Sequence, residues 1–120
     1  MIILATIAAG IPGAVLRYLL DIKLIAGLGT YFPWSTLIIN SLGCLGIGVL
    51  FGLQQNYPGI AYGLEIISFG FLGAFTTFST FSLQWMLMME EHRIIKTVFY
   101  IAASVILGVG FTVSGWYIVI

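Results

Sequence analysis

The stretch from 70 to 81, GFLGAFTTFSTF, combines side chains that could hold a small anion inside an apolar segment. Phenylalanine ring edges carry partial positive charge, and hydroxyl groups donate hydrogen bonds. Gly70 and Gly73 weaken a helix just before the hydroxyl-bearing residues. A helix that breaks at mid-membrane frees carbonyl oxygens, which are tolerated only where protein, water or an ion satisfies them. The hydroxyls belong to Thr76, Thr77, Ser79 and Thr80.

A packing interpretation of the same stretch also has to be considered. In an uninterrupted helix, Phe75, Phe78 and Phe81 would follow one another at intervals of three along one side, as an aromatic stripe. For an arbitrary membrane helix that stripe is the commoner explanation. The hydroxyls around the rings and the glycines before them favour a break that suits a small, strongly hydrated anion.

Further polar groups lie inside apolar runs. Arg17 shares one helical face with Ala5, Ala9 and Gly13, so this face is expected to pack closely against protein. Arg17 itself either snorkels to the interface or has a buried structural or ion-attracting role. Asn40 precedes a glycine-rich face. Its amide is expected either to form a hydrogen bond to another helix or to have a direct functional role.

The last apolar run carries a similar face, with Ser104, Gly108 and Thr112 four residues apart and Tyr100 one turn earlier. Every apolar run therefore has a face of small residues. Four short helices are too few to bury four such faces, so self-association or a partner is expected.

Enzyme chemistry finds little support in the ionisable residues. The carboxylates and the single histidine all fall at or near the ends of apolar runs, so no buried acid/base pair or metal cluster is predicted. The run EEHR at 90–93 is typical of a solvated helix end. The chain is therefore expected not to be an enzyme. These residues are Asp21, Glu65, Glu90, Glu91 and His92.

The elements that must position these groups are membrane spans. Of 120 residues, 61% are hydrophobic and 7% are charged, against roughly 25% charged in soluble domains. Runs of about the 20 residues that a helix needs to cross a bilayer predict an all-α membrane protein with four transmembrane helices in one domain. The spans are expected at about 2–20, 34–53, 62–89 and 97–119.

Other classes are disfavoured by the same composition. The first run is expected to be a span and not a cleaved signal peptide, because no Lys or Arg precedes it and three more runs follow. Net charge is zero, which gives no support for binding nucleic acid. Cys44 lies inside the second run and, as the single cysteine, cannot form an internal disulfide.

Three motifs in order, GAVLRY at 13–18, STLIINSLG at 35–43 and GFLGAFTTFSTF at 70–81, closely resemble the CrcB/Fluc family of fluoride channels. The resemblance covers essentially the whole chain. It implies a passive, selective channel in the cell membrane that exports fluoride and relieves its toxicity. It also implies an antiparallel dimer. Two departures are Ser35, expected to touch a loop, and the bulky Phe75, expected to alter packing beside the break.

The resemblance implies a role for each matching residue. The ring edges of Phe78 and Phe81 would face fluoride, and Asn40 would line the pore. Arg17 would support the pore structure. Ser79, Thr80, Tyr100 and Ser104 would form a hydroxyl track along the fluoride pathway, and backbone carbonyls of Gly73 and Thr76 would hold a structural sodium ion at the dimer interface.

Two alternatives remain open beside a fluoride channel. A small four-span multidrug or cation exporter needs a membrane-embedded carboxylate, and Glu65 lies only at the lip of the third run. A non-transporting membrane assembly subunit could use the same glycine faces, but it would not need hydroxyls and phenylalanines clustered at a break.

Orientation is predicted from the basic residues, which all belong to the side of the 21–33 and 90–96 connections. The positive-inside rule places that side in the cytoplasm. A chain with such a bias is expected to insert mainly one way, and so to pair with an oppositely oriented paralogue. A dual-topology homodimer is the alternative. The four basic residues are Arg17, Lys23, Arg93 and Lys96.

Overall fold

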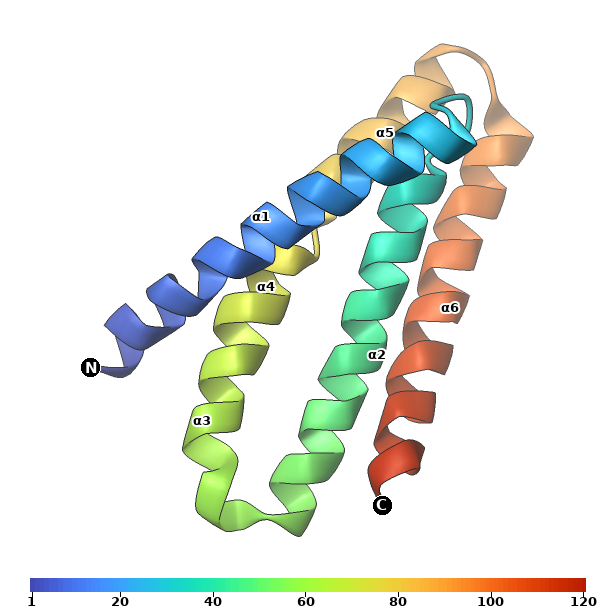
Figure 1. Ribbon diagram of the computed structural model, residues 1–120. Helices are drawn as coiled ribbons and strands as arrows, with labels where there is room; N and C mark the ends of the chain where they lie inside the picture. Colours follow the sequence, from blue (N-terminus) through green and yellow to red (C-terminus); the bar gives the residue numbers. More distant parts are fainter.

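The computed structural model describes residues 1–120 as helices joined by short connections (Figure 1). Four stretches are long and apolar enough to span a membrane, and the third is interrupted, as the sequence predicts. The first, second and last spans are α1 (Ile2–Leu28), α2 (Trp34–Asn56) and α6 (Ile94–Val119). The third consists of η1 (Pro58–Ile60), α3 (Ala61–Ile66), η2 (Ile67–Leu72), α4 (Gly73–Phe75) and α5 (Phe78–Glu90).

The helices extend beyond the apolar runs that mark them in the sequence. Although the first run ends at Leu20, α1 continues through Asp21 to Leu28 and stops at Gly29, whose φ is 77°. Residues 21–26 contain no glycine or proline that would interrupt this helix. Hydropathy marks the part of a helix that lies in hydrocarbon, and the helix itself ends where the backbone meets a residue that favours a left-handed turn.

The α2 and α6 helices lie side by side along much of their length and make the most extensive contact in the chain (Figure 1). Glycines let their backbones approach, because a Cβ on Gly48 would collide with the Thr112 carbonyl. A Cβ on Gly115 would likewise collide with the Leu45 carbonyl. Close packing of small residues is how helices associate in lipid, where neighbouring tails are as apolar as the side chains.

The α1 helix crosses the third span obliquely and packs against η2 and α4 (Figure 1). Gly13 is its one buried residue, and a Cβ there would run into the Phe71 carbonyl. A Cβ on Gly70 of η2 would in turn meet the Thr6 carbonyl and the Ala9 side chain. The prediction that the Ala5–Ala9–Gly13 face packs against protein is confirmed at Ala9 and Gly13.

Large apolar side chains cover the outside of the helices. Ile95 is 87% exposed and Phe69 75% exposed, values that suit contact with lipid tails and not with water. The largest buried side chains are few, and Tyr100 and Ile39 are the two nearly inaccessible hydrophobic ones. The four apolar helices and their exposed apolar side chains are those of a multi-pass membrane protein.

Candidate functional site

The third span breaks at Thr76 and Thr77, where the backbone is extended between α4 and α5. Asn40 of α2 clamps this break through both halves of its amide. Its Nδ2 donates to the Thr77 carbonyl at 2.9 Å, and the Thr77 N–H donates to its Oδ1 at 2.8 Å. The Thr77 hydroxyl accepts from the Thr80 N–H at 3.2 Å and so caps the start of α5.

Two carbonyls at the break lose the donors that a continuous helix would supply. The N–H of Thr77 would reach the Gly73 carbonyl, and the N–H of Thr80 would reach the Thr76 carbonyl. These donors bond instead to Asn40 and to the Thr77 hydroxyl. Freed carbonyl oxygens at a broken helix are ligands of the kind that coordinate sodium, so the chemistry of Gly73 and Thr76 fits that ion.

A groove of about 310 Å³ lies beside the break, between α2, α5 and α6. Phe78 stands at its lip and is 78% exposed, and the Phe78 and Phe81 ring centroids are 5.8 Å apart. The Ser104 hydroxyl is shielded from solvent and has no hydrogen-bond partner, so its proton is free for a ligand. This break groove is lined by Asn40, Cys44, Ile47, Thr76, Thr77, Phe78, Phe81, Ser104 and Val105.

Not every residue of the expected pathway faces this groove. Tyr100 is fully buried behind Phe81, with ring centroids 5.1 Å apart, and its hydroxyl donates to Gln84 Oε1 at 3.1 Å. Thr80 lines a different cavity, and Ser79 is exposed, with its hydroxyl 3.4 Å from that of Thr77. The structure thus gathers Asn40, Phe78, Phe81 and Ser104, and leaves Ser79 and Thr80 outside their groove.

Arg17 lines that second cavity, of about 170 Å³, between α1, α2 and α5. Its Nε is shielded from solvent and has no hydrogen-bond partner. Asp21 shares this cavity and accepts a hydrogen bond from the buried Ser35 hydroxyl. The Ser35 hydroxyl thus contacts Asp21, a residue that the sequence interpretation placed in the 21–33 connection but that lies on a helix, because α1 continues past Leu20.

Phe75 is buried just before the break and stacks on Phe71, with ring centroids 6.2 Å apart and planes 6° apart. It also lies beside Gly43, where an added Cβ would stand 3.6 Å from its ring. The break thus separates Phe75, which packs inside the chain, from Phe78, which is exposed. An uninterrupted stripe of three rings does not form.

The sequence interpretation gave no role to Gln84, and it counted Thr77 among the hydroxyls without foreseeing that Thr77 caps α5 and bonds to Asn40. Thr77 carried a signal, since a threonine ahead of a helical run is a favourable N-cap. Gln84 carried a weaker one, as a polar side chain well inside an apolar run. Its bond to Tyr100 depends on how α5 packs against α6, which the sequence does not reveal.

The connections at one end of the molecule hold a cluster of cations around Tyr31. The Arg93 Nη1 donates to the Tyr31 carbonyl at 2.7 Å, and the Lys96 ammonium lies 3.3 Å from the centroid of the phenol ring. Lys96, through a hydrogen bond and then through its charge, lowers the pKa of the Tyr31 phenol below 10.0. The 29–33 and 91–93 connections therefore share one side of the membrane.

The fold and the site together define a small multi-pass membrane protein with a polar break inside its third span. The chain belongs to the CrcB-like family, since the family model described as "CrcB-like protein, Camphor Resistance (CrcB)" matches residues 4–116. The resemblance inferred from the three sequence motifs is thereby confirmed.

Similar proteins come from several bacteria. A protein of Rhodospirillum centenum named fluoride-specific ion channel FluC is 43% identical over 114 residues, which cover 94% of this chain and 90% of that protein. Fluoride-specific ion channel FluC 1 of Nitrobacter hamburgensis is 42% identical over 120 residues, covering 98% and 94%. A protein named FluC from Leptospira interrogans is 36% identical over 111 residues, covering 92% and 87%.

Proposed function

We propose that this chain forms a passive, fluoride-selective channel that exports fluoride across the bacterial cell membrane. The relatives named as fluoride-specific channels support this function. The observation that carries it is the break groove, which combines the exposed Phe78 ring, Phe81, Asn40 and the unpartnered Ser104 hydroxyl. Aromatic edges and hydroxyl protons are donors that can replace part of the hydration shell of a small anion.

A passive pathway is sufficient for this task. Fluoride enters acidified cells as neutral HF, dissociates in the cytoplasm and is trapped there as the anion. The negative-inside potential then drives it outward with about 2.3 kcal/mol per 100 mV. Selectivity would arise from a narrow set of fixed donors, because incompletely replaced hydration is costly for an ion.

The proposed channel is an antiparallel dimer. Phe78 is 78% exposed at the lip of the break groove, and the groove is open on one side, so a second chain would enclose the pathway. The basic residues at one end of the molecule favour a heterodimer with an oppositely oriented paralogue. An ordinary homodimer would require the same chain to insert in both orientations.

A sodium ion at the dimer interface belongs to the same proposal. The Gly73 and Thr76 carbonyls, which lack their helical donors, would hold it, together with the same pair from the second chain. When bound, the ion would offset the repulsion between the two anion pathways of one dimer. The chain's own contribution is the clamp by which Asn40 keeps the break open and those carbonyls free.

Fluoride efflux from liposomes that contain the purified protein tests the function. We expect efflux of fluoride and none of chloride, while a cation exporter or an assembly subunit would release neither. The partner question is tested by expressing the chain alone with single cysteines placed in the 29–33 and 54–59 segments. Labelling from one side with little efflux would support the heterodimer, and equal labelling with full efflux would establish the homodimer.

A further inference from the structure

The break groove continues beyond the break as part of a longer furrow. A second hollow, along α6 and Cys44, shares Cys44, Ser104 and Val105 with the break groove. A third hollow shares Thr112 and Val113 with the second and reaches the last turns of α2 and α6. Neighbouring hollows share lining residues, so the three follow one another along the contact between these helices, and together they are called the seam furrow here. The third hollow is lined by Gly48, Phe51, Gln54, Gln55, Thr112, Val113 and Trp116.

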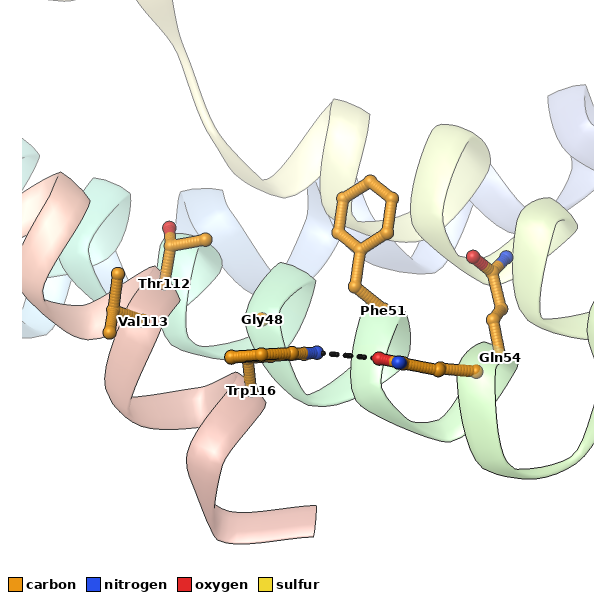
Figure 2. A pocket seen from close by; sticks show the side chains of 7 residues that line it. Gly48, Phe51, Gln54, Thr112, Val113 and Trp116 are labelled. Atoms are coloured by element: carbon orange, nitrogen blue, oxygen red, sulfur yellow. Dashed lines mark hydrogen bonds between the residues drawn. The ribbon is translucent and has the colours of Figure 1, made fainter. Parts of the chain in front are cut away.

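The far end of the seam furrow holds a side-chain amide whose orientation is fixed. The Trp116 Nε1–H donates to Gln55 Oε1 at 3.1 Å, the bond drawn as a dashed line in Figure 2. An indole can only donate, so this bond turns the oxygen of the Gln55 amide toward Trp116. The amide nitrogen is left free to donate to a ligand. Gln55 is exposed and lies one residue before the end of α2.

The middle of the furrow offers no comparable donor. The Thr112 hydroxyl donates its proton to the Gly108 carbonyl at 2.8 Å, so only its lone pairs face the furrow. Val113 and Gly48 complete this section of the wall (Figure 2). The free donors therefore lie at the two ends, with Ser104 beside the break and the Gln54 and Gln55 amides at the membrane interface, where tryptophans such as Trp116 are enriched. Of these two amides, Gln55 is the one whose orientation is fixed by Trp116.

We propose that Gln55, oriented by Trp116, forms an anion-receiving mouth at which a hydrated fluoride ion is held on its way to or from the break. The inference rests on the proposed function, because the open side of the seam furrow must be closed by a second chain before it can carry an anion. The proposal assigns a ligand-binding role to Gln55 at the interface end of α2, with a small halide as the ligand.

Charge substitutions at Gln55 test the mouth directly. We would compare Gln55→Lys and Gln55→Glu by fluoride efflux from liposomes at low ionic strength and at fluoride concentrations below saturation. A unit charge roughly 7 Å from an entering anion changes its local concentration about threefold in water. The lysine variant should therefore be faster and the glutamate variant slower than wild type, and they should differ from each other about sevenfold.

Two further features separate a mouth from a structural role. The difference between the charge variants should vanish near 1 M salt, where the Debye length is about 3 Å. Trp116→Phe, which keeps the ring but removes the donor, should slow efflux, and it should have no further effect in a Gln55→Leu background. Tyr117→Phe and Tyr62→Lys, at exposed positions of the same end that do not line the furrow, serve as matched controls.

The efflux measurements have three possible results. Opposite, salt-sensitive effects of lysine and glutamate support the mouth. Equal efflux in both charge variants, or a change of efflux in the same direction, overturns the proposed mouth but not the proposed channel. The hollow beside Gln55 is then a surface that contacts lipid. If the wild-type protein releases no fluoride, the proposed function fails, and the mouth fails with it.

Discussion

Replacing Asn40 with leucine should destabilise the break more than any neighbouring substitution in α2. Leucine has a similar size but can neither donate to the Thr77 carbonyl nor accept from the Thr77 N–H, which now bond to Asn40 at 2.9 and 2.8 Å. Leaving a buried donor or acceptor unsatisfied costs about 1–3 kcal/mol. Both Thr77 groups are partly buried and retain some access to water, so Asn40→Leu should lower the free energy of unfolding by about 2–3 kcal/mol, the low end of that range.

The measurement is reversible unfolding in detergent micelles, combined with amide hydrogen exchange at Thr77. Ser41→Ala is the control, because the Ser41 hydroxyl donates to the Leu37 carbonyl of its own helix. That carbonyl keeps its place in the helical ladder, so the control should lose about 1 kcal/mol or less. If both variants unfold alike and the Thr77 amide stays protected, the Asn40 clamp does not hold the break open.

Three other sets of substitutions probe different parts of the molecule. Phe78→Ile and Phe81→Ile keep apolar bulk but remove the ring edge, so fluoride efflux should fall sharply while the elution volume on gel filtration stays that of the wild type; undiminished efflux in both would return the rings to a packing role. Gly13→Ala forces a Cβ onto a facing carbonyl and should destabilise the fold by about 1–3 kcal/mol, whereas Gly27→Ala, with nothing within 4 Å, should be neutral or stabilising in the same unfolding assay. Lys96→Met should raise the pKa of Tyr31 toward 10.0 in an ultraviolet titration of the phenol. Folding lowers this pKa, so the phenolate of Tyr31 stabilises the folded protein above the pKa that Tyr31 has in the unfolded chain. That stabilisation is lost as the pH falls through the pKa of the folded protein. A Tyr31 pKa that does not move would exclude Lys96 as the cause.

The spans and the break could be predicted from the sequence because both depend on local composition. Runs of apolar residues identify helices that cross lipid, and glycines followed by Thr76 and Thr77 mark a point where a helix is weak. The ends of α1 could not be predicted from hydropathy, since Asp21 and Lys23 are polar but still helical.

The organisation of the site depends on contacts between distant segments. Asn40 and Thr77 are 37 residues apart, and nothing in either motif shows that one amide satisfies both backbone groups of the other residue. The separation of Thr80 from the break groove follows from the rotation of α5 after the break, which restarts the helical phase. A periodicity carried through the break would place Phe75 and Phe78 on the same side, whereas one is buried and the other exposed.

The contact between α2 and α6 also constrains how the protein is made. These helices are each other's main partners, but the whole third span lies between them in the chain. During synthesis α2 therefore enters the bilayer before the helix that covers its glycine face exists. Until α6 inserts, Gly48 and Gly52 face lipid or a chaperone, and the walls of the seam furrow cannot form. Folding of the conducting region must be a late, post-insertion event, and a chain that stalls before α6 would expose the surface by which membrane quality control could recognise it.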